Sequence, residues 1–245
     1  MQCGAGEFVR CVHRKRSVGE WLKWIVAALA GLLASASQLN ITAAADGKLP
    51  LGGGAGIVVD GSYCTLTTIG HDRAGELVGF TAAHCGGPGS PVVAEGAEDR
   101  GPLGTVVAAS DERLDYAVIK FDPAKVTAIA NFDGFVINGI GPGNHEWHQP
   151  ACKLGAATGY ICTRIMSFPG PGPGMNFSGL FQPGDDGGPV TSDDLLIAMI
   201  HNGWVTPGWP GNADTPVTNL IKFSAILDDV NTNGGPGAGF TPVSA

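Results

Sequence analysis

Three separated segments of the sequence carry residue types that could together perform acyl transfer. His84 lies in FTAAHC, Asp115 lies in LDYAVI, and Asp186 lies in the glycine-rich string GDDGGP. Acyl transfer needs a histidine base, an acid that fixes its tautomer, and paired backbone N–H groups that bind the oxyanion. The glycine-rich string offers such N–H groups, but Asp186 stands where a hydroxyl nucleophile is expected.

Short β-like runs separated by turn residues must position these segments. The 245 residues include 39 Gly and 17 Pro, and only 15% of them are charged. Apolar and β-branched runs bounded by Gly, Pro, Asn or Asp predict many short strands, as in a barrel or sandwich. Apolar spacing from Leu220 to Val230 predicts a helix, and the Gly-rich residues 231–245 predict a disordered tail.

The first 45 residues differ from the rest of the chain. Five of the 14 Lys and Arg residues lie there, and all five precede the apolar run Trp24–Ala34, which is short for a membrane span. This pattern predicts a signal peptide over residues 1–45, cleaved after Ala36 or Ala45, with an uncleaved anchor as the alternative. We therefore expect a secreted, extracytoplasmic protein.

Charge and cysteine content narrow the partners of the remaining chain. Without residues 1–45 it keeps nine basic and twenty acidic residues, a net charge of about −11, which disfavours nucleic acid and anionic membranes as partners. Four cysteines remain, Cys64, Cys85, Cys152 and Cys162. An even count in an exported protein indicates two disulfides, with free buried thiols as the alternative.

These motifs and their order resemble those of the chymotrypsin-fold, trypsin-like serine proteases, and most of all the bacterial streptogrisin and α-lytic protease branch. TAAHC is similar to the family's histidine motif, and ACKLGAATGYIC resembles the second disulfide loop of the bacterial branch. The resemblance covers roughly residues 55–229. It implies an all-β fold of two six-stranded antiparallel β-barrels, residues 54–130 and 131–219, with a C-terminal helix at residues 220–230.

The resemblance also assigns roles to single residues. His84 matches the general base, Asp115 matches the acid that orients it, and the backbone N–H groups of Gly184 and Asp186 match the oxyanion donors. Three structural pairs are implied as well. The buried acid Asp185 would be held by Lys153, and the disulfides would be Cys64–Cys85 and Cys152–Cys162.

Five residues are candidates for contact with substrate. The resemblance implies that the backbone of His201, Asn202 and Gly203 would pair with a peptide as an added strand. The residue types of Leu180 and Phe181 indicate an apolar pocket, if hydrolysis is the ancestral activity.

Three positions depart from the family's pattern. Asp186 replaces the nucleophilic serine, so we expect no ordinary peptidase turnover. Its carboxylate would pair with Nε2 of His84, or alternatively block the oxyanion hole. His201 replaces a small serine beside Asp115 and is expected to crowd it, while Gln182 stands where a pocket cysteine is common.

We therefore expect an exported, monomeric protease homologue that needs no cofactor and binds a peptide or protein in its cleft. One alternative is an active endopeptidase that uses His84 and Asp115 with another nucleophile. A second alternative is a metal site, although Asp115 and Asp186 would face opposite sides of the His84 ring, so that only His201 could supply a third ligand.

A loop elsewhere also contains metal-ligand residue types. His145, Glu146 and His148 lie in GIGPGNHEWHQP, where no helix aligns them. We expect a solvated loop there, and no bound metal.

Overall fold

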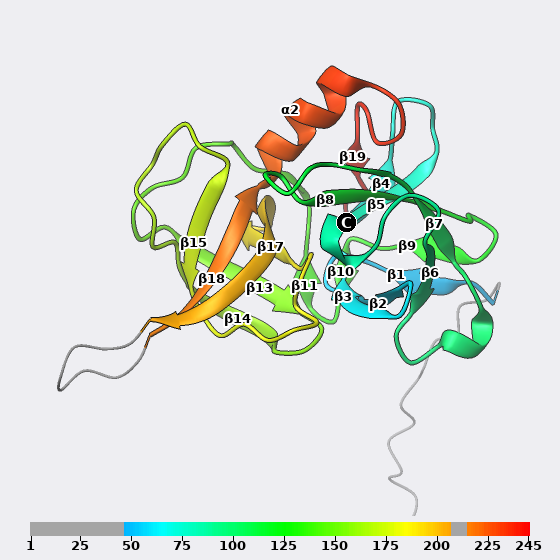
Figure 1. Ribbon diagram of the computed structural model, residues 1–245, viewed down its shortest axis with the longest axis horizontal. Helices are drawn as coiled ribbons and strands as arrows, with labels where there is room; N and C mark the ends of the chain where they lie inside the picture. The colour runs from blue at the N-terminus through cyan, green and yellow to red at the C-terminus, as the bar shows by residue number, and fades with distance from the viewer. Residues whose placement is uncertain (1–46, 207–214) are drawn as a thin grey trace, which may run out of the picture. The chain divides into compact units, whose positions relative to one another are not determined.

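Strands dominate residues 47–206 and 215–245, the part of the chain that the computed structural model describes (Figure 1). These residues belong to one compact unit, Ala44–Ala245. The expected signal peptide falls outside the described residues. No helix in the described ranges is long and apolar enough to cross a membrane.

The first sheet has eight strands in the order β3-β2-β6-β7-β8-β5-β4-β19, all paired antiparallel. Ala82 of β5 lies opposite Tyr116 of β8, so the residues just beyond them, His84 and Asp115, come to the same end of the sheet. The strands are β2 (Gly56–Val59), β3 (Ser62–Thr65), β4 (Thr68–His71), β5 (Leu77–Ala82), β6 (Pro91–Ala94), β7 (Gly104–Ala109), β8 (Tyr116–Phe121) and β19 (Thr241–Pro242). Two 3₁₀ helices, η1 (Ala83–Cys85) and η2 (Glu98–Arg100), and the parallel pair β1 (Leu49–Leu51) with β9 (Val126–Ala128) accompany this sheet.

The second sheet has seven strands in the order β14-β13-β16-β17-β18-β15, with β12 pairing parallel to β17. A tight turn at Asp193 and Asp194, both with positive φ, joins β16 to β17. The strands are β12 (Gly139–Ile140), β13 (Pro150–Gly155), β14 (Gly159–Arg164), β15 (Gly174–Ser178), β16 (Pro189–Ser192), β17 (Leu195–Thr206) and β18 (Thr215–Lys222). A small hairpin of β10 (Asn131–Phe132) and β11 (Phe135–Val136) lies between the sheets in the sequence.

The segment after the last helix is ordered, so the expectation of a disordered tail over residues 231–245 was wrong. Helix α2 (Phe223–Asn233) ends at Gly234, and the chain then returns to the first sheet, where Thr241 pairs with His71. Phe240 is buried, and its ring lies 5.0 Å from that of Phe80 in an edge-to-face contact. Two buried apolar residues, Ala238 and Phe240, therefore outweigh the Gly-rich composition that predicted disorder.

The expected fold class is confirmed, because the protein has two curled β-sheets and one C-terminal helix (Figure 1). The sheets contain eight and seven strands, more than the six expected for each, with β19 extending the first and β12 joining the second. Helix α2 begins and ends three residues later than expected, and it buries Phe223, Ile226 and Val230.

Candidate active site

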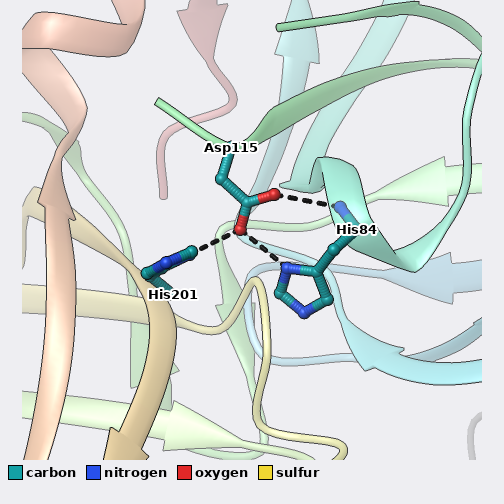
Figure 2. A group of neighbouring side chains, drawn as sticks. All are labelled: His84, Asp115 and His201. Atoms are coloured by element: carbon teal, nitrogen blue, oxygen red, sulfur yellow. Dashed lines mark hydrogen bonds and ion pairs between the residues drawn. The ribbon is translucent and has the colours of Figure 1, made fainter. Parts of the chain in front are cut away.

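His84 and Asp115 meet at one end of the first sheet. His84 lies in η1 directly after β5, and Asp115 directly precedes β8. The ring Nδ1 of His84 donates a hydrogen bond to Asp115 Oδ2 over 2.7 Å, and the backbone N–H of His84 donates to Oδ1 over 3.0 Å (Figure 2). Two bonds from one residue hold the carboxylate, and the carboxylate in turn orients the ring.

The backbone of Asp115 adopts a left-handed conformation with φ of +46°. Aspartate tolerates this region better than most residues because its short polar side chain can bond locally. The Asp115 N–H donates to the Asp111 carbonyl, and its own carbonyl accepts from the Ala83 N–H, both over 2.8 Å. These bonds tie the acid to the segment that carries His84.

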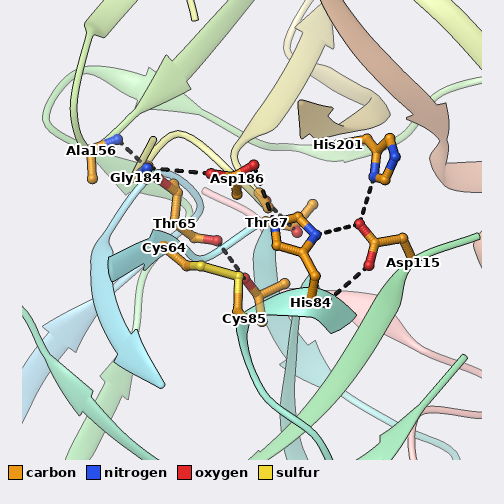
Figure 3. The surroundings of a disulfide bond; sticks show 12 residues. Cys64, Thr65, Thr67, His84, Cys85, Asp115, Ala156, Gly184, Asp186 and His201 are labelled. Atoms are coloured by element: carbon orange, nitrogen blue, oxygen red, sulfur yellow. Dashed lines mark hydrogen bonds and ion pairs between the residues drawn. A yellow bond between two sulfur atoms is a disulfide. The ribbon is translucent and has the colours of Figure 1, made fainter. Parts of the chain in front are cut away.

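Asp186 uses both oxygens of its carboxylate. Nε2 of His84 lies 3.2 Å from Oδ1, and the backbone N–H of Gly184 donates to Oδ2 over 3.3 Å. Figure 3 shows Asp186 between these two partners. Pairing with His84 and occupation of an oxyanion donor were alternatives from the sequence, and the structure combines them in one carboxylate.

The two carboxylates around His84 set its charge. Hydrogen bonds to Asp115 and Asp186 raise the pKa of His84 from 6.5 to about 10, against the opposing effect of burial. Burial favours a raised pKa for Asp115, but its contacts with His84 and His201 outweigh this and lower the pKa. The site therefore holds an imidazolium between two carboxylates near neutral pH.

His201 contacts Asp115 without displacing His84. It lies in β17, and its Nδ1 donates to Asp115 Oδ2 over 2.6 Å (Figure 2). The rings of His84 and His201 lie 6.0 Å apart at an angle of 73°. The expected crowding does not separate Asp115 from His84, because both histidines share one carboxylate oxygen.

Asp185 is a fully buried anchor behind the site. Lys153 Nζ donates to its Oδ2 over 3.0 Å, and both side chains are 0% exposed. Thr158 adds a hydroxyl and a backbone N–H to the same carboxylate, at 2.6 and 2.9 Å. Burial lowers the pKa of Lys153, and the attraction of Asp185 opposes this shift. This network fixes the turn that carries Asp186.

Threonine hydroxyls that the sequence analysis did not single out tie this turn to the first sheet. Thr65 Oγ1 donates to the Gly184 carbonyl over 2.7 Å, and Thr67 Oγ1 donates to the Gly187 carbonyl over 2.5 Å. The Thr65 N–H also donates to the Asp186 carbonyl over 2.8 Å. Thr65 is the last residue of β3 and Thr67 lies just after it, and threonines at a strand end beside Cys64 predict nothing about their partners.

The strand β17 has an open edge beside the site. Residues 202–206 pair with β18 on one side, and no described strand pairs with them on the other. A cavity of about 470 Å³ adjoins this edge and is lined by His84, Glu112, Asp115, His201 and Asn202. Glu112 was not expected at the site, because it lies two residues before LDYAVI and outside that motif.

The two residues expected to form an apolar pocket are not part of this cavity. Phe181 packs beside Gly203, where an added Cβ would lie 2.4 Å from Phe181 Cβ. Leu180 is 45% exposed. The apolar pocket therefore stays a prediction.

Both expected disulfides are present. Cys64 is bonded to Cys85, and Cys152 is bonded to Cys162. The first disulfide lies next to His84 (Figure 3).

The loop that contains His145, Glu146 and His148 is only partly solvated, so the expectation of a solvated loop was wrong for His145. His145 is 4% exposed, its Nε2 lies 3.2 Å from the Ser167 carbonyl, and burial lowers its pKa. Glu146 and His148 are exposed. Within the described residues, the contact that accompanies the burial of His145 is the one between its Nε2 and the Ser167 carbonyl.

Solved structures similar to this one are bacterial serine proteases. Protease A of Thermobifida fusca has a TM-score of 0.61 at 18% identity, over 80% of this chain and 100% of that chain. The Nocardiopsis protease has a TM-score of 0.61 at 17% identity, over 80% and 100%. The α-lytic protease homologue N4 has a TM-score of 0.57 at 21% identity, over 79% and 99%. The fold is that of the chymotrypsin-like serine proteases.

No protein-family model and no curated protein sequence matches the chain. In the chymotrypsin-like fold seen here, the two sheets supply different parts of the site. His84 and Asp115 come from the first sheet, whereas Asp186 and His201 come from the segment that builds the second.

Proposed function

We propose that the protein is an exported serine-protease homologue that lacks peptidase activity and binds extended peptides in its cleft. The observation that carries the proposal is the position of the Asp186 carboxylate. It contacts the His84 Nε2 that would activate a hydroxyl, and it accepts the Gly184 N–H that would bind a substrate's oxyanion.

Asp186 is a poor substitute for a serine hydroxyl. An ionised carboxylate gives His84 no proton to remove, and a negative charge at the Gly184 N–H competes with a developing oxyanion. In another serine protease, loss of the nucleophile lowers kcat about 10⁶-fold, which corresponds to ~8 kcal/mol of barrier. Nothing in the remaining contacts offsets a loss of this size.

Peptide binding is supported by the open edge of β17. An extended peptide can add to a free strand edge through backbone hydrogen bonds, and neighbouring pockets then select its side chains. The cavity beside His201 and Asn202 offers room for one such side chain. Export is supported by the two disulfides, which form and persist in oxidising compartments.

The decisive experiment compares the wild type with Asp186→Ser in peptidase and esterase assays and in labelling by a serine-directed fluorophosphonate. We expect no turnover or labelling for the wild type. Activity that appears only in Asp186→Ser would show that the base, the acid and the oxyanion donors are intact. Asp99→Ser, on the exposed helix η2, is the matched control, and turnover by the wild type would refute the proposal.

Peptide binding is tested separately with a peptide library followed by calorimetry. Backbone N-methylation of a bound peptide at alternate positions should weaken binding at least tenfold, because it removes donors to the strand edge. Methylation at the intervening positions should have little effect. Equal loss at all positions, or no binding by any peptide, would contradict the strand-addition part of the proposal.

A further inference from the structure

His84, Asp115 and His201 bring three potential metal ligands together. One ligand atom from each residue lies within 4.8 Å of the other two. Figure 2 shows both imidazole rings directed at the same carboxylate, with Nδ1 of each ring bonded to Oδ2. Two of the three residues come from the first sheet and one from the second, so the cluster exists only in the folded protein.

The donor set has the chemistry of a transition-metal site. Two neutral imidazoles and one carboxylate are ligands that zinc and similar divalent ions prefer. We propose that His84 Nδ1, Asp115 Oδ2 and His201 Nδ1 bind one divalent transition-metal ion, with zinc the best match. The ion would take the place of the two shared N–H protons: charged His84 would release its Nδ1 proton to solvent and keep Nε2–H, and His201 would bind as the neutral tautomer that carries its proton on Nε2.

The two N···O contacts need to change only slightly to admit the ion. The present N···O separations are 2.7 and 2.6 Å. Tetrahedral zinc with bonds of about 2.0–2.1 Å separates its ligand atoms by roughly 3.3 Å. The two contacts would therefore open by less than roughly one ångström, which side-chain rotations on η1 and β17 can supply.

Asp186 has the position of an outer-shell partner in such a site. Histidines that bind metal through one ring nitrogen commonly donate the other N–H to a carboxylate, which fixes the tautomer. Nε2 of His84 lies 3.2 Å from Asp186 Oδ1, on the side of the ring opposite Nδ1. Asp115 Oδ1 is in turn held by the His84 backbone N–H.

The cluster is open on one side. All three residues line the cavity of about 470 Å³, together with Glu112 and Asn202. The side chains of His84 and His201 are 46% and 29% exposed, which gives an ion access from solvent. Three protein ligands beside a solvent-filled cavity leave a fourth position for water, the arrangement of reactive zinc sites rather than of closed structural ones.

The two departures from serine proteases thus acquire a common explanation. His201 supplies a ligand that a serine could not, and Asp186 supplies an outer-shell acceptor. This proposal does not depend on peptide binding, because it is tested with metal ions alone.

The test is calorimetric titration of the purified, chelator-treated protein with Zn²⁺, together with visible absorption after addition of Co²⁺. We expect one ion per chain and a tetrahedral cobalt spectrum. His201→Ser should weaken binding at least 100-fold, and Asp186→Asn should weaken it about 10- to 100-fold. His148→Asn, which removes an exposed imidazole and suits the positive φ of 63° at that position, should leave binding unchanged.

A measurement on the wild type guards against variants that do not fold. In ¹⁵N-labelled protein, Zn²⁺ should shift the Nδ1 resonances of His84 and His201 but not the ring resonances of His148. Absence of stoichiometric binding, or binding that persists in folded His201→Ser, overturns the proposal and leaves a cluster held by shared protons. Shifts confined to His145 or His148 overturn it in favour of the loop.

Discussion

Nε2 of His84 lies 3.2 Å from Oδ1 of Asp186, and Nδ1 of the same ring lies 2.7 Å from Oδ2 of Asp115. This arrangement places a carboxylate at each ring nitrogen of His84. It makes His84 a stably charged residue, and this charge can be measured directly.

The first prediction concerns the titration of His84 in metal-free protein. Its pKa should lie near 10, because Asp115 and Asp186 both stabilise the imidazolium. NMR of the labelled ring should show a charged His84 at pH 7, and Asp186→Asn should lower the pKa while Asp99→Asn leaves it unchanged. A neutral His84 at pH 7 would contradict the paired arrangement.

The second prediction concerns stability and pH. The pKa of His84 is higher in the folded protein than its ordinary value of 6.5, so folding favours the protonated form. The stabilisation is fully present below pH 6.5 and is lost as pH rises toward 10. Urea unfolding of wild type and His84→Gln across this range should give a difference that shrinks with rising pH. A difference in the free energy of unfolding that stays constant across this pH range would contradict the prediction.

The third prediction concerns the buried pair of Lys153 and Asp185. Lys153→Ala should lower the free energy of unfolding by about 3–5 kcal/mol, because it leaves a buried carboxylate without its charge partner. Lys120→Ala, which breaks the exposed pair with Glu76, should cost less than about 1 kcal/mol. Chemical denaturation measures both, and equal small losses would show that Asp185 is satisfied by Thr158 and backbone donors alone.

The fourth prediction concerns the segment after helix α2. Phe240→Ala should destabilise the protein by about 3–5 kcal/mol, because it removes a buried ring packed against Phe80 and Phe223. Thr241→Ala, whose side chain is exposed, should have little effect. Similar stability of Phe240→Ala and wild type would restore the interpretation of residues 231–245 as a disordered tail.

The fold and the segments that carry His84 and Asp115 could be predicted from the sequence. The motif of each segment places a residue able to do chemistry among characteristic neighbouring residues. Both disulfides followed from the same resemblance. The position of Asp186 could only be narrowed to two alternatives, since a carboxylate has two oxygens and the sequence does not say where each points. The resemblance placed His201 beside Asp115, but it predicted crowding and not the hydrogen bond between them, because the orientation of the His201 ring depends on the packing of the two sheets.

Other features escaped prediction because tertiary burial overrode composition. Phe240 follows a glycine-rich stretch whose composition favours disorder. Its single aromatic ring is enough to anchor the segment, because the ring packs against Phe80 and Phe223. His145 lies in a Gly- and Pro-rich loop, yet it is buried beneath the neighbouring segment. Whether such a side chain is buried depends on which surfaces the rest of the folded chain leaves uncovered for it to pack against.

The hydrogen bonds from Thr65 and Thr67 have a consequence for how the site can change over evolution. They end on the carbonyls of Gly184 and Gly187, so these two bonds hold the main chain of the turn without using the side chain at position 186. The side chain at position 186 can therefore be replaced while these two bonds to the turn remain. Substitutions of Thr65 and Thr67, in contrast, would loosen the turn whichever side chain stands at position 186.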